Sequence, residues 1–200
     1  MSPTITVLNA GLRVPSSSRL LAERIADAVG VRVPGARIEL VDLRSYAHPM
    51  MDALLTGFPT GELADVLAPV AASDALVVVT PTFQATYSGL FKTFVDLIDK
   101  DALRGTPVLL AATGGSERHS LMIDHGLRPL FAYLGAEPLA TGIFAATADF
   151  GGGEGLESRI DRAARELAAR LAVPAADDRA AGGADADVVP FEELLRRYSA

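Results

Sequence analysis

Two stretches of this 200-residue chain, residues 75–80 and 107–113, are almost continuously apolar. A strand with apolar residues at every position has to be covered on both of its faces, as an inner strand of a parallel sheet is. The first run stops at Pro81, and small and polar residues follow it. The chain is therefore expected to contain the centre of a sheet that helices cover on both sides, with one strand ending at Pro81.

Shorter patterns on either side of these runs add three further strands, which gives five in total. They are expected at residues 4–8, 37–43 and 139–146. Apolar residues at helical spacing indicate helices between the strands. These are expected at residues 19–29, 61–72, 88–100, 120–134 and 157–171, with an internal proline in the second and the fourth. Residues 45–60 show no clear period and are expected to form a long loop.

Strands that alternate with helices predict an α/β fold with a parallel sheet, right-handed crossovers and helices on both faces, which makes three layers. For five strands in a chain of this size, we expect the strand order 2-1-3-4-5. Residues 1–172 are predicted to form one domain. Residues 173–187 are rich in Ala, Gly and Asp and are predicted to be a flexible linker. The last residues are predicted to form a short amphipathic helix, with apolar positions at Phe191, Leu194, Leu195 and Tyr198.

Composition excludes several classes of function. The net charge of −7 disfavours nucleic acid and anionic membranes as partners, because both require basic surfaces. The chain has no cysteine, which excludes disulfides, thiolate nucleophiles and Cys-based zinc sites, and no metal site is predicted. The N-terminus lacks the pattern of a signal peptide, and no apolar run is long enough for a membrane span, so a cytoplasmic protein is expected.

The expected strand order predicts where a ligand binds. In such sheets the site lies at the carboxyl ends of the strands, where strands 1 and 3 diverge. Three loops leave neighbouring strand ends there, at residues 9–18, 81–88 and 114–119. The same three loops have an unusual composition, and this agreement is the main evidence for a site.

The first loop carries groups that suit a phosphate. It has the hydroxyls of Ser16, Ser17 and Ser18, the cation of Arg13, and the free N–H groups of the helix that follows. The alternative is that the serines only cap that helix. Neither a Walker P-loop nor Gly-x-Gly-x-x-Gly is present, which disfavours ATP and dinucleotide sites of the usual type.

The second and third loops suit a planar ring. The second offers backbone groups, the amide of Gln84 and the aromatic surface of Phe83 and Tyr87, although a plain turn explains it equally well. The third offers bare backbone at Gly114 and Gly115. A lone histidine such as His119 is more often a surface or capping residue than a ligand contact.

The sequence resembles the NADPH-dependent FMN reductase family, which has the flavodoxin-like fold. The resemblance spans residues 4–148 and is carried by "TPTFQATYSGLFKTFVDLI" and "LAATGGSERHSLMIDHGLRPLFAYLGA". Within the family, the chain is most similar to the reductases that supply reduced flavin to two-component monooxygenases. The first loop, "NAGLRVPSSS", departs from the commoner Gly-Ser-x-Arg-x-x-Ser of the family.

The resemblance implies a role for each loop in holding FMN. The FMN phosphate would be bound by Arg13, Ser16 and Ser18, with Ser17 beside them. The ribityl chain and isoalloxazine ring would contact Pro81, Thr82, Phe83, Gln84 and Ala85. The pyrimidine side of the ring would meet Thr113, Gly114, Gly115, Ser116 and His119.

The resemblance also implies the activity, a hydride transfer from NAD(P)H to N5 of the flavin, for which no catalytic side chain is predicted. FMN and NAD(P)H are the implied cofactors, and a homodimer or homotetramer and a partner monooxygenase are the implied assemblies. Quinone or azo reduction with bound FMN uses the same site. A flavodoxin-like electron carrier, or a module that has lost its flavin, are the alternatives of other classes.

Overall fold

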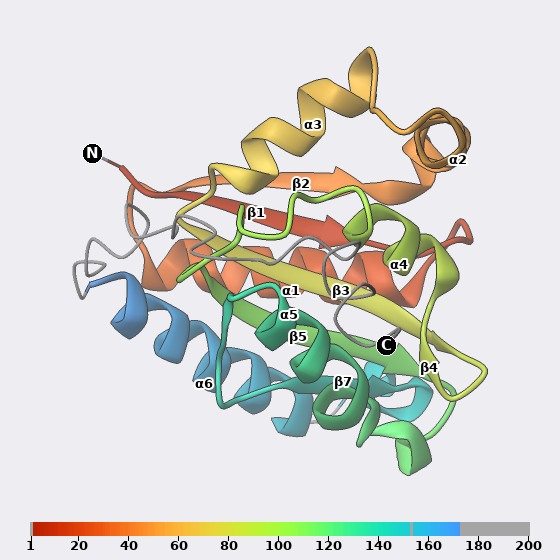
Figure 1. Ribbon diagram of the computed structural model, residues 1–200. Helices are drawn as coiled ribbons and strands as arrows, with labels where there is room; N and C mark the ends of the chain where they lie inside the picture. Colours follow the sequence, from red (N-terminus) through yellow and green to blue (C-terminus); the bar gives the residue numbers. More distant parts are fainter. Residues whose placement is uncertain (1, 153, 173–200) are drawn as a thin grey trace, which may run out of the picture.

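The computed structural model describes residues 2–152 and 154–172. Its central sheet has seven strands, which are β1 (Thr4–Asn9), β2 (Arg37–Asp42), β3 (Ala75–Phe83), β4 (Thr86–Tyr87), β5 (Pro107–Gly114), β6 (Glu137–Pro138) and β7 (Ile143–Ala146). The parallel strands follow the order β2-β1-β3-β5-β6, with β7 pairing farther along β5 (Figure 1). The predicted α/β class and the winding order are confirmed, because β6 and β7 together occupy the place of the fifth strand.

The sheet has seven strands rather than the expected five for two reasons. β3 turns back into the antiparallel β4, and the last strand is broken into β6 and β7. At the break, Arg128 donates to the carbonyl oxygens of Leu139 (2.7 Å) and Ala140 (3.2 Å). The Glu166 carboxylate accepts the N–H groups of Ala140 (2.7 Å) and Thr141 (3.0 Å). Side chains thus satisfy backbone groups that a continuous strand would have paired with β5.

Alternate residues of the inner strands belong to two different cores. Leu76 and Val78 of β3 point into one core, whereas Val77 and Val79 point into the other. All four side chains are fully buried. A period of two with apolar residues on both faces is what the continuous apolar run predicted.

The helices divide between the two faces of the sheet (Figure 1). One core is covered by α1 (Ser17–Arg32) and α6 (Glu154–Leu171). The other is covered by α2 (Ala47–Thr56), α3 (Glu62–Ala71), α4 (Gly89–Val95) and α5 (Arg128–Tyr133). The predicted three layers are therefore present.

The expected loop at residues 45–60 is wrong. A 3₁₀ turn at Leu43–Tyr46 leads into α2, which ends at Gly57 in the left-handed conformation (φ +90°). Only Met50 and Ala53 of α2 are buried, whereas large apolar residues on its other side are exposed. A helix with so narrow a buried stripe and so apolar an exposed side shows no clear period in its sequence.

Two further boundaries differ from expectation. β3 does not stop at Pro81, because Pro81 is still in register with Thr113 of β5 and the strand continues to Phe83. The expected helix at residues 120–134 is a 3₁₀ turn (Glu117–His119), a π-helix (Ile123–Leu127) and then α5. Pro129, which has no N–H to donate, lies in the first turn of α5, directly after the π-helix.

Every helix within residues 2–152 and 154–172 is too short or too polar to span a membrane. The predicted linker and C-terminal amphipathic helix lie outside the described residues.

Candidate functional site

A cavity of about 380 Å³ opens at the carboxyl edge of the sheet. Its walls come from the β1–α1 loop, the end of β3, the end of β5 and the residue that follows β7. It therefore lies where the strand order predicted a ligand. The lining residues are Gly11, Leu12, Arg13, Pro15, Ser16, Ser17, Ser18, Pro81, Thr82, Phe83, Thr113, Gly114, Gly115 and Thr147.

The cavity brings together ten of the fourteen predicted site residues, from all three loops. Four predicted residues do not line it. Gln84 lies in the β3–β4 turn and Ser116 precedes a 3₁₀ turn. Ala85 and His119 line a neighbouring cavity of about 310 Å³, together with Arg118.

Four further lining residues were not predicted from the sequence, namely Gly11, Leu12, Pro15 and Thr147. A Cβ atom on Gly11 would lie 2.2 Å from Ser16 Oγ, so only glycine lets the loop fold back on itself. A glycine between a strand and a helix was the signal that could have identified it. Thr147 directly follows β7, so the rule that ligands bind at strand ends applies to it as well.

The start of α1 is arranged for an anion. Ser16 is the N-cap, and its Oγ accepts the N–H of Arg19 at 3.2 Å. The first N–H groups of a helix have no partner within the helix, and the helix dipole adds a partial positive charge there. Arg13 is exposed and forms no ion pair within the described part of the chain, and no Asp or Glu lines this cavity. A chain of net charge −7 thus has a locally positive cavity.

Ser18 has a structural partner that the sequence did not reveal. Its hydroxyl lies 2.8 Å from Thr113 Oγ1, and both side chains are buried. The bond joins the first turn of α1 to the end of β5. Ser18 therefore borders the cavity with a hydroxyl that is already paired.

The β3–β4 turn forms a rigid edge of the cavity. Thr80 Oγ1 accepts the N–H of Ser88 at 3.1 Å, and Ser88 Oγ accepts the N–H of Phe91 at 3.2 Å as the N-cap of α4. At the tip, Gln84 (φ +48°) and Ala85 (φ +69°) are both in the left-handed region. Non-glycine residues pay about 1–2 kcal/mol each for that conformation, and such strain is found mostly at functional sites.

Thr82 carries an unpaired polar atom. Its Oγ1 is buried and has no hydrogen-bond partner within the described residues, although Thr82 lines the cavity. Buried hydroxyls nearly always have a partner in a native protein. The unpaired oxygen therefore points to a ligand that completes this part of the site.

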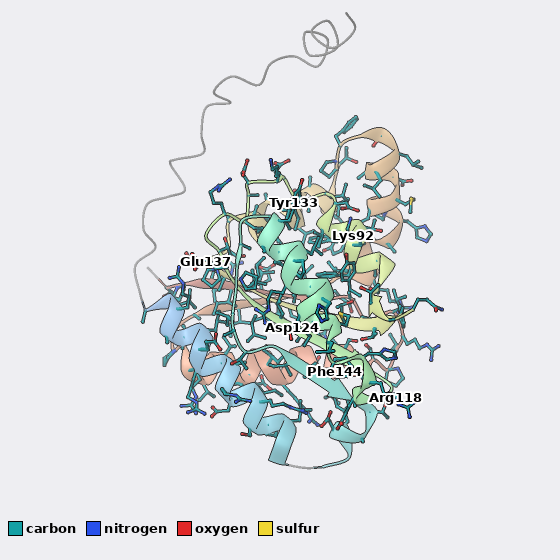
Figure 2. The ribbon with its side chains drawn as sticks, turned by 60° about the horizontal axis from the view of Figure 1, so that its bottom comes forward. Lys92, Arg118, Asp124, Tyr133, Glu137 and Phe144 are labelled. Carbon is teal, nitrogen blue, oxygen red and sulfur yellow. The ribbon has the colours of Figure 1, made fainter. Side chains whose placement is uncertain are left out.

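The two glycines at the end of β5, Gly114 as its last residue and Gly115 just after it, have different functions. A Cβ on Gly114 would lie 2.7 Å from the Phe144 ring, so Gly114 allows β7 to pack closely. Gly115 has no neighbour within 4 Å of such an atom and leaves open backbone at the cavity. Figure 2 shows Phe144 and Arg118 toward one end of the molecule, whereas Tyr133 and Glu137 lie toward the other.

The profile of the NADPH-dependent FMN reductase family matches residues 3–151, which include every residue of this cavity. The chain belongs to this family. It is 35% identical over 176 residues to the NADH-dependent FMN reductase SfnF of Pseudomonas putida, covering 86% of this chain and 95% of that protein. It is 39% identical over 171 residues to an FMN reductase (NADPH) of Pseudomonas aeruginosa, covering 84% and 91%.

Solved structures of similar proteins have the same architecture. An oxidoreductase from Corynebacterium diphtheriae superposes with a TM-score of 0.80 at 44% identity, over 86% of this chain and 97% of that one. The apo form of the NADH:FMN oxidoreductase EMOB superposes with a TM-score of 0.76 at 25% identity, over 89% of this chain and 94% of that one.

The residues of the cavity fit the cofactor of this family. A phosphate monoester matches the helix start and the unpaired Arg13. The unpaired hydroxyl of Thr82 and the bare backbone at Gly115 match the polar edge of a flat heterocycle. The structure thus provides complementary groups at both ends of an FMN molecule.

Proposed function

We propose that this protein is an NAD(P)H-dependent FMN reductase whose flavin occupies the 380 Å³ cavity. The observation that carries the proposal is the pairing of two features in one cavity. An anion site formed by Arg13 and the start of α1 lies at one side, and the unpaired Thr82 hydroxyl lies at another. A molecule with a phosphate and a polar planar ring satisfies both.

The flavin phosphate would be held by Arg13, Ser16, Ser17 and the N–H groups of α1. Ser18 would act indirectly, because its hydroxyl bonds to Thr113 and so fixes the start of α1 relative to the loop that follows β5. The ring would lie between Pro81–Ala85 on one side and Thr113–Ser116 with His119 on the other. FMN supplies the hydride acceptor, so the protein contributes position, electrostatics and exclusion of water.

Three broader features are part of the same proposal. The reductase is proposed to be cytoplasmic and to supply reduced FMN to a partner monooxygenase. It is also proposed to form a homodimer or homotetramer. Exposed apolar side chains on and just after α2 support an oligomer, namely Met51, Leu54, Leu55 and Phe58. Sedimentation of the full-length protein tests this, and a monomer at micromolar concentration would contradict it.

The experiment that tests the activity is anaerobic mixing of the protein with FMN and then with NADH or NADPH. The visible spectrum of the purified protein is recorded first, to show whether flavin remains bound. A reductase bleaches the flavin absorbance in a step that saturates with protein and nicotinamide. Flavin binding without bleaching would identify an electron carrier instead. Faster turnover with quinone or azo acceptors than with free FMN would favour a quinone or azo reductase that keeps its FMN bound.

A further inference from the structure

A second cavity, of about 430 Å³, lies on the other side of the phosphate loop, which is formed by residues 10–17 from just after β1 to the first residue of α1. Five residues of that loop line both cavities, so the loop forms a shared wall. They are Gly11, Arg13, Pro15, Ser16 and Ser17. The remaining residues of the second cavity are Val14 of the same loop and residues from the end of β1, from α1, from the end of β2 and from the 3₁₀ turn that follows β2.

The strand order explains why two cavities meet at this loop. β1 pairs with β3 on one side and with β2 on the other. The first cavity extends over β3 and β5, whereas the second extends toward β2. A ligand with its phosphate at the start of α1 therefore has open space in both directions along the carboxyl edge.

The second cavity contains an unpaired buried donor. Asn9 is 1% exposed and lines this cavity but not the first. Its Oδ1 accepts the N–H of Gly11 at 3.1 Å, which fixes the side chain. Its Nδ2 is buried and has no partner within the described residues. A buried amide donor of this kind is complementary to a ring nitrogen or another acceptor of a ligand.

The charges around the cavity leave cations free. Arg19 engages both acidic residues of the lining, Glu23 at 2.7 Å and Asp42 at 3.7 Å. Arg13 and Arg44 form no ion pair with any residue of the described chain, and both line the cavity. Unpaired guanidinium groups beside a phosphate loop suit a second phosphate.

The remaining lining suits a nucleoside. Asp42 ends β2, and a carboxylate at that place beside a phosphate loop can accept ribose hydroxyls, as it does in other doubly wound sheets. Val14, Pro15 and Leu20 supply apolar surface for the face of a base. The cavity thus offers an acceptor for the ribose, a donor and apolar surface for the base, and cations for the phosphate, which are the parts of an adenylate group.

We infer that the second cavity is a subsite for the adenylate group of a dinucleotide whose other half reaches the first cavity. This inference rests on the proposed flavin function. Two ligands carry that chemistry: FAD is FMN extended by adenylate, and NAD(P)H brings the same adenylate as a separate ligand whose nicotinamide would reach the bound FMN. Asn9 recognises the base, Asp42 the ribose, and Arg13 with Arg44 the phosphates.

Binding measurements on the full-length protein test the subsite, and kinetic assays then distinguish the two sources of the adenylate group. Calorimetric titrations use 5′-AMP, FMN and FAD, and kinetic assays then give the KM for NAD(P)H. The blocking variant is Leu20→Trp, which fills the cavity from the exposed side of α1. Its matched control is Val31→Trp, on the same helix at an exposed position outside the cavity lining.

The wild type is expected to bind 5′-AMP. Leu20→Trp is expected to lower the affinity for 5′-AMP by about tenfold, while the affinity for FMN stays within about twofold. Val31→Trp should change neither. If FAD is the source of the adenylate, FAD binds more tightly than FMN and loses that advantage in Leu20→Trp. If NAD(P)H is the source, FAD has no advantage, and the variant raises the KM for NAD(P)H instead.

A second pair of variants tests the charge rather than the space. Arg44→Ala is expected to lower the affinity for 5′-AMP by about tenfold, because a charge-assisted hydrogen bond to the phosphate is lost. Arg162→Ala is the matched control, since Arg162 is exposed on α6, unpaired within the described residues and outside all three cavities described above. Absence of 5′-AMP binding, or binding that neither Leu20→Trp nor Arg44→Ala weakens, would overturn the inference. FMN binding in the same experiment separates this result from a failure of the proposed function, which would abolish FMN binding too.

Discussion

Ser18 Oγ and Thr113 Oγ1 lie 2.8 Å apart, although the two residues are 95 positions apart in the sequence. The bond connects the first turn of α1, which directly follows the phosphate loop, to the end of β5, and both side chains are buried. Two of the three loops that form the candidate flavin site are thereby held at a fixed separation.

Ser18→Ala should therefore affect both stability and binding. The Thr113 hydroxyl would lose its partner in a buried place, which costs about 1–2 kcal/mol. FMN affinity should also fall, because the start of α1 is no longer fixed to β5. Urea unfolding and FMN titration measure the two effects. Ser17→Ala is the control for stability alone, since Ser17 is itself proposed to contact the phosphate but its exposed hydroxyl has no protein partner in the described structure. Equal stability of the two variants would contradict the interpretation.

Gly11→Ala tests how tightly the phosphate loop is folded. The added methyl group would lie 2.2 Å from Ser16 Oγ, so the N-cap of α1 has to move. We expect a loss of about 1–3 kcal/mol in stability and a large loss of FMN affinity. Gly89→Ala is the matched control, because nothing lies within 4 Å of its added atom. Similar unfolding midpoints and FMN affinities for both variants would show that the loop tolerates the group.

Ala85→Gly should stabilise the protein, unlike most substitutions to glycine. Ala85 has φ +69°, a conformation that costs an alanine about 1–2 kcal/mol and a glycine almost nothing. After the entropic cost of glycine, a net gain of about 0.5–1 kcal/mol remains, which raises Tm by about 1–4 °C for a chain of this size. Ala64→Gly, inside α3, is the control and should lower Tm. A lower Tm for Ala85→Gly would contradict the left-handed turn.

Glu166 links stability to pH. Partial burial raises the pKa of its carboxyl, but the hydrogen bonds from Thr141 and Ala140 more than reverse this, so the pKa lies below its ordinary value of 4.5. A lowered pKa means that the ionised group favours the folded state. Its contribution is complete above pH 4.5 and is lost as the pH falls through the folded-state pKa. Glu166→Gln should cost about 1 kcal/mol near neutral pH. The difference from the wild type should shrink below pH 4.5, and a difference that is constant with pH in urea unfolding would refute this role.

The parts of the fold that sequence could predict are those decided by local pattern. Residues 75–79 of β3 and 107–112 of β5 are apolar at every position, and small and polar residues follow them, so the sheet and the position of the site followed from them. The parts that were missed depend on tertiary contacts. α2 buries only Met50 and Ala53, and the break before β7 is held by Glu166 and Arg128, which are distant in sequence.

The same distinction applies to the site. Loop composition pointed to the serine hydroxyls, the arginine, the glycines and Phe83 of the cavity, and the family resemblance added Pro81, Thr82 and Thr113, which together give the ten predicted residues that line it. A turn in the second loop was one of the two interpretations of its sequence, but the β3–β4 hairpin was not predicted, since Gln84-Ala85 lacks the Asn-Gly or Asp-Gly pattern that usually marks such a turn. The Ser18–Thr113 bond could not be predicted either, because it forms only when α1 packs beside β5.

The most direct test of the account is steady-state oxidation of NAD(P)H by purified full-length protein as a function of added FMN. The rate should rise and saturate with FMN. Arg13→Ala should raise the FMN concentration for half-maximal rate by about tenfold while the maximal rate changes little, because the lost contact is to the phosphate and not to the ring. Oxidation that is independent of flavin, or a half-saturation point that Arg13→Ala leaves unchanged, would contradict a flavin held by this cavity.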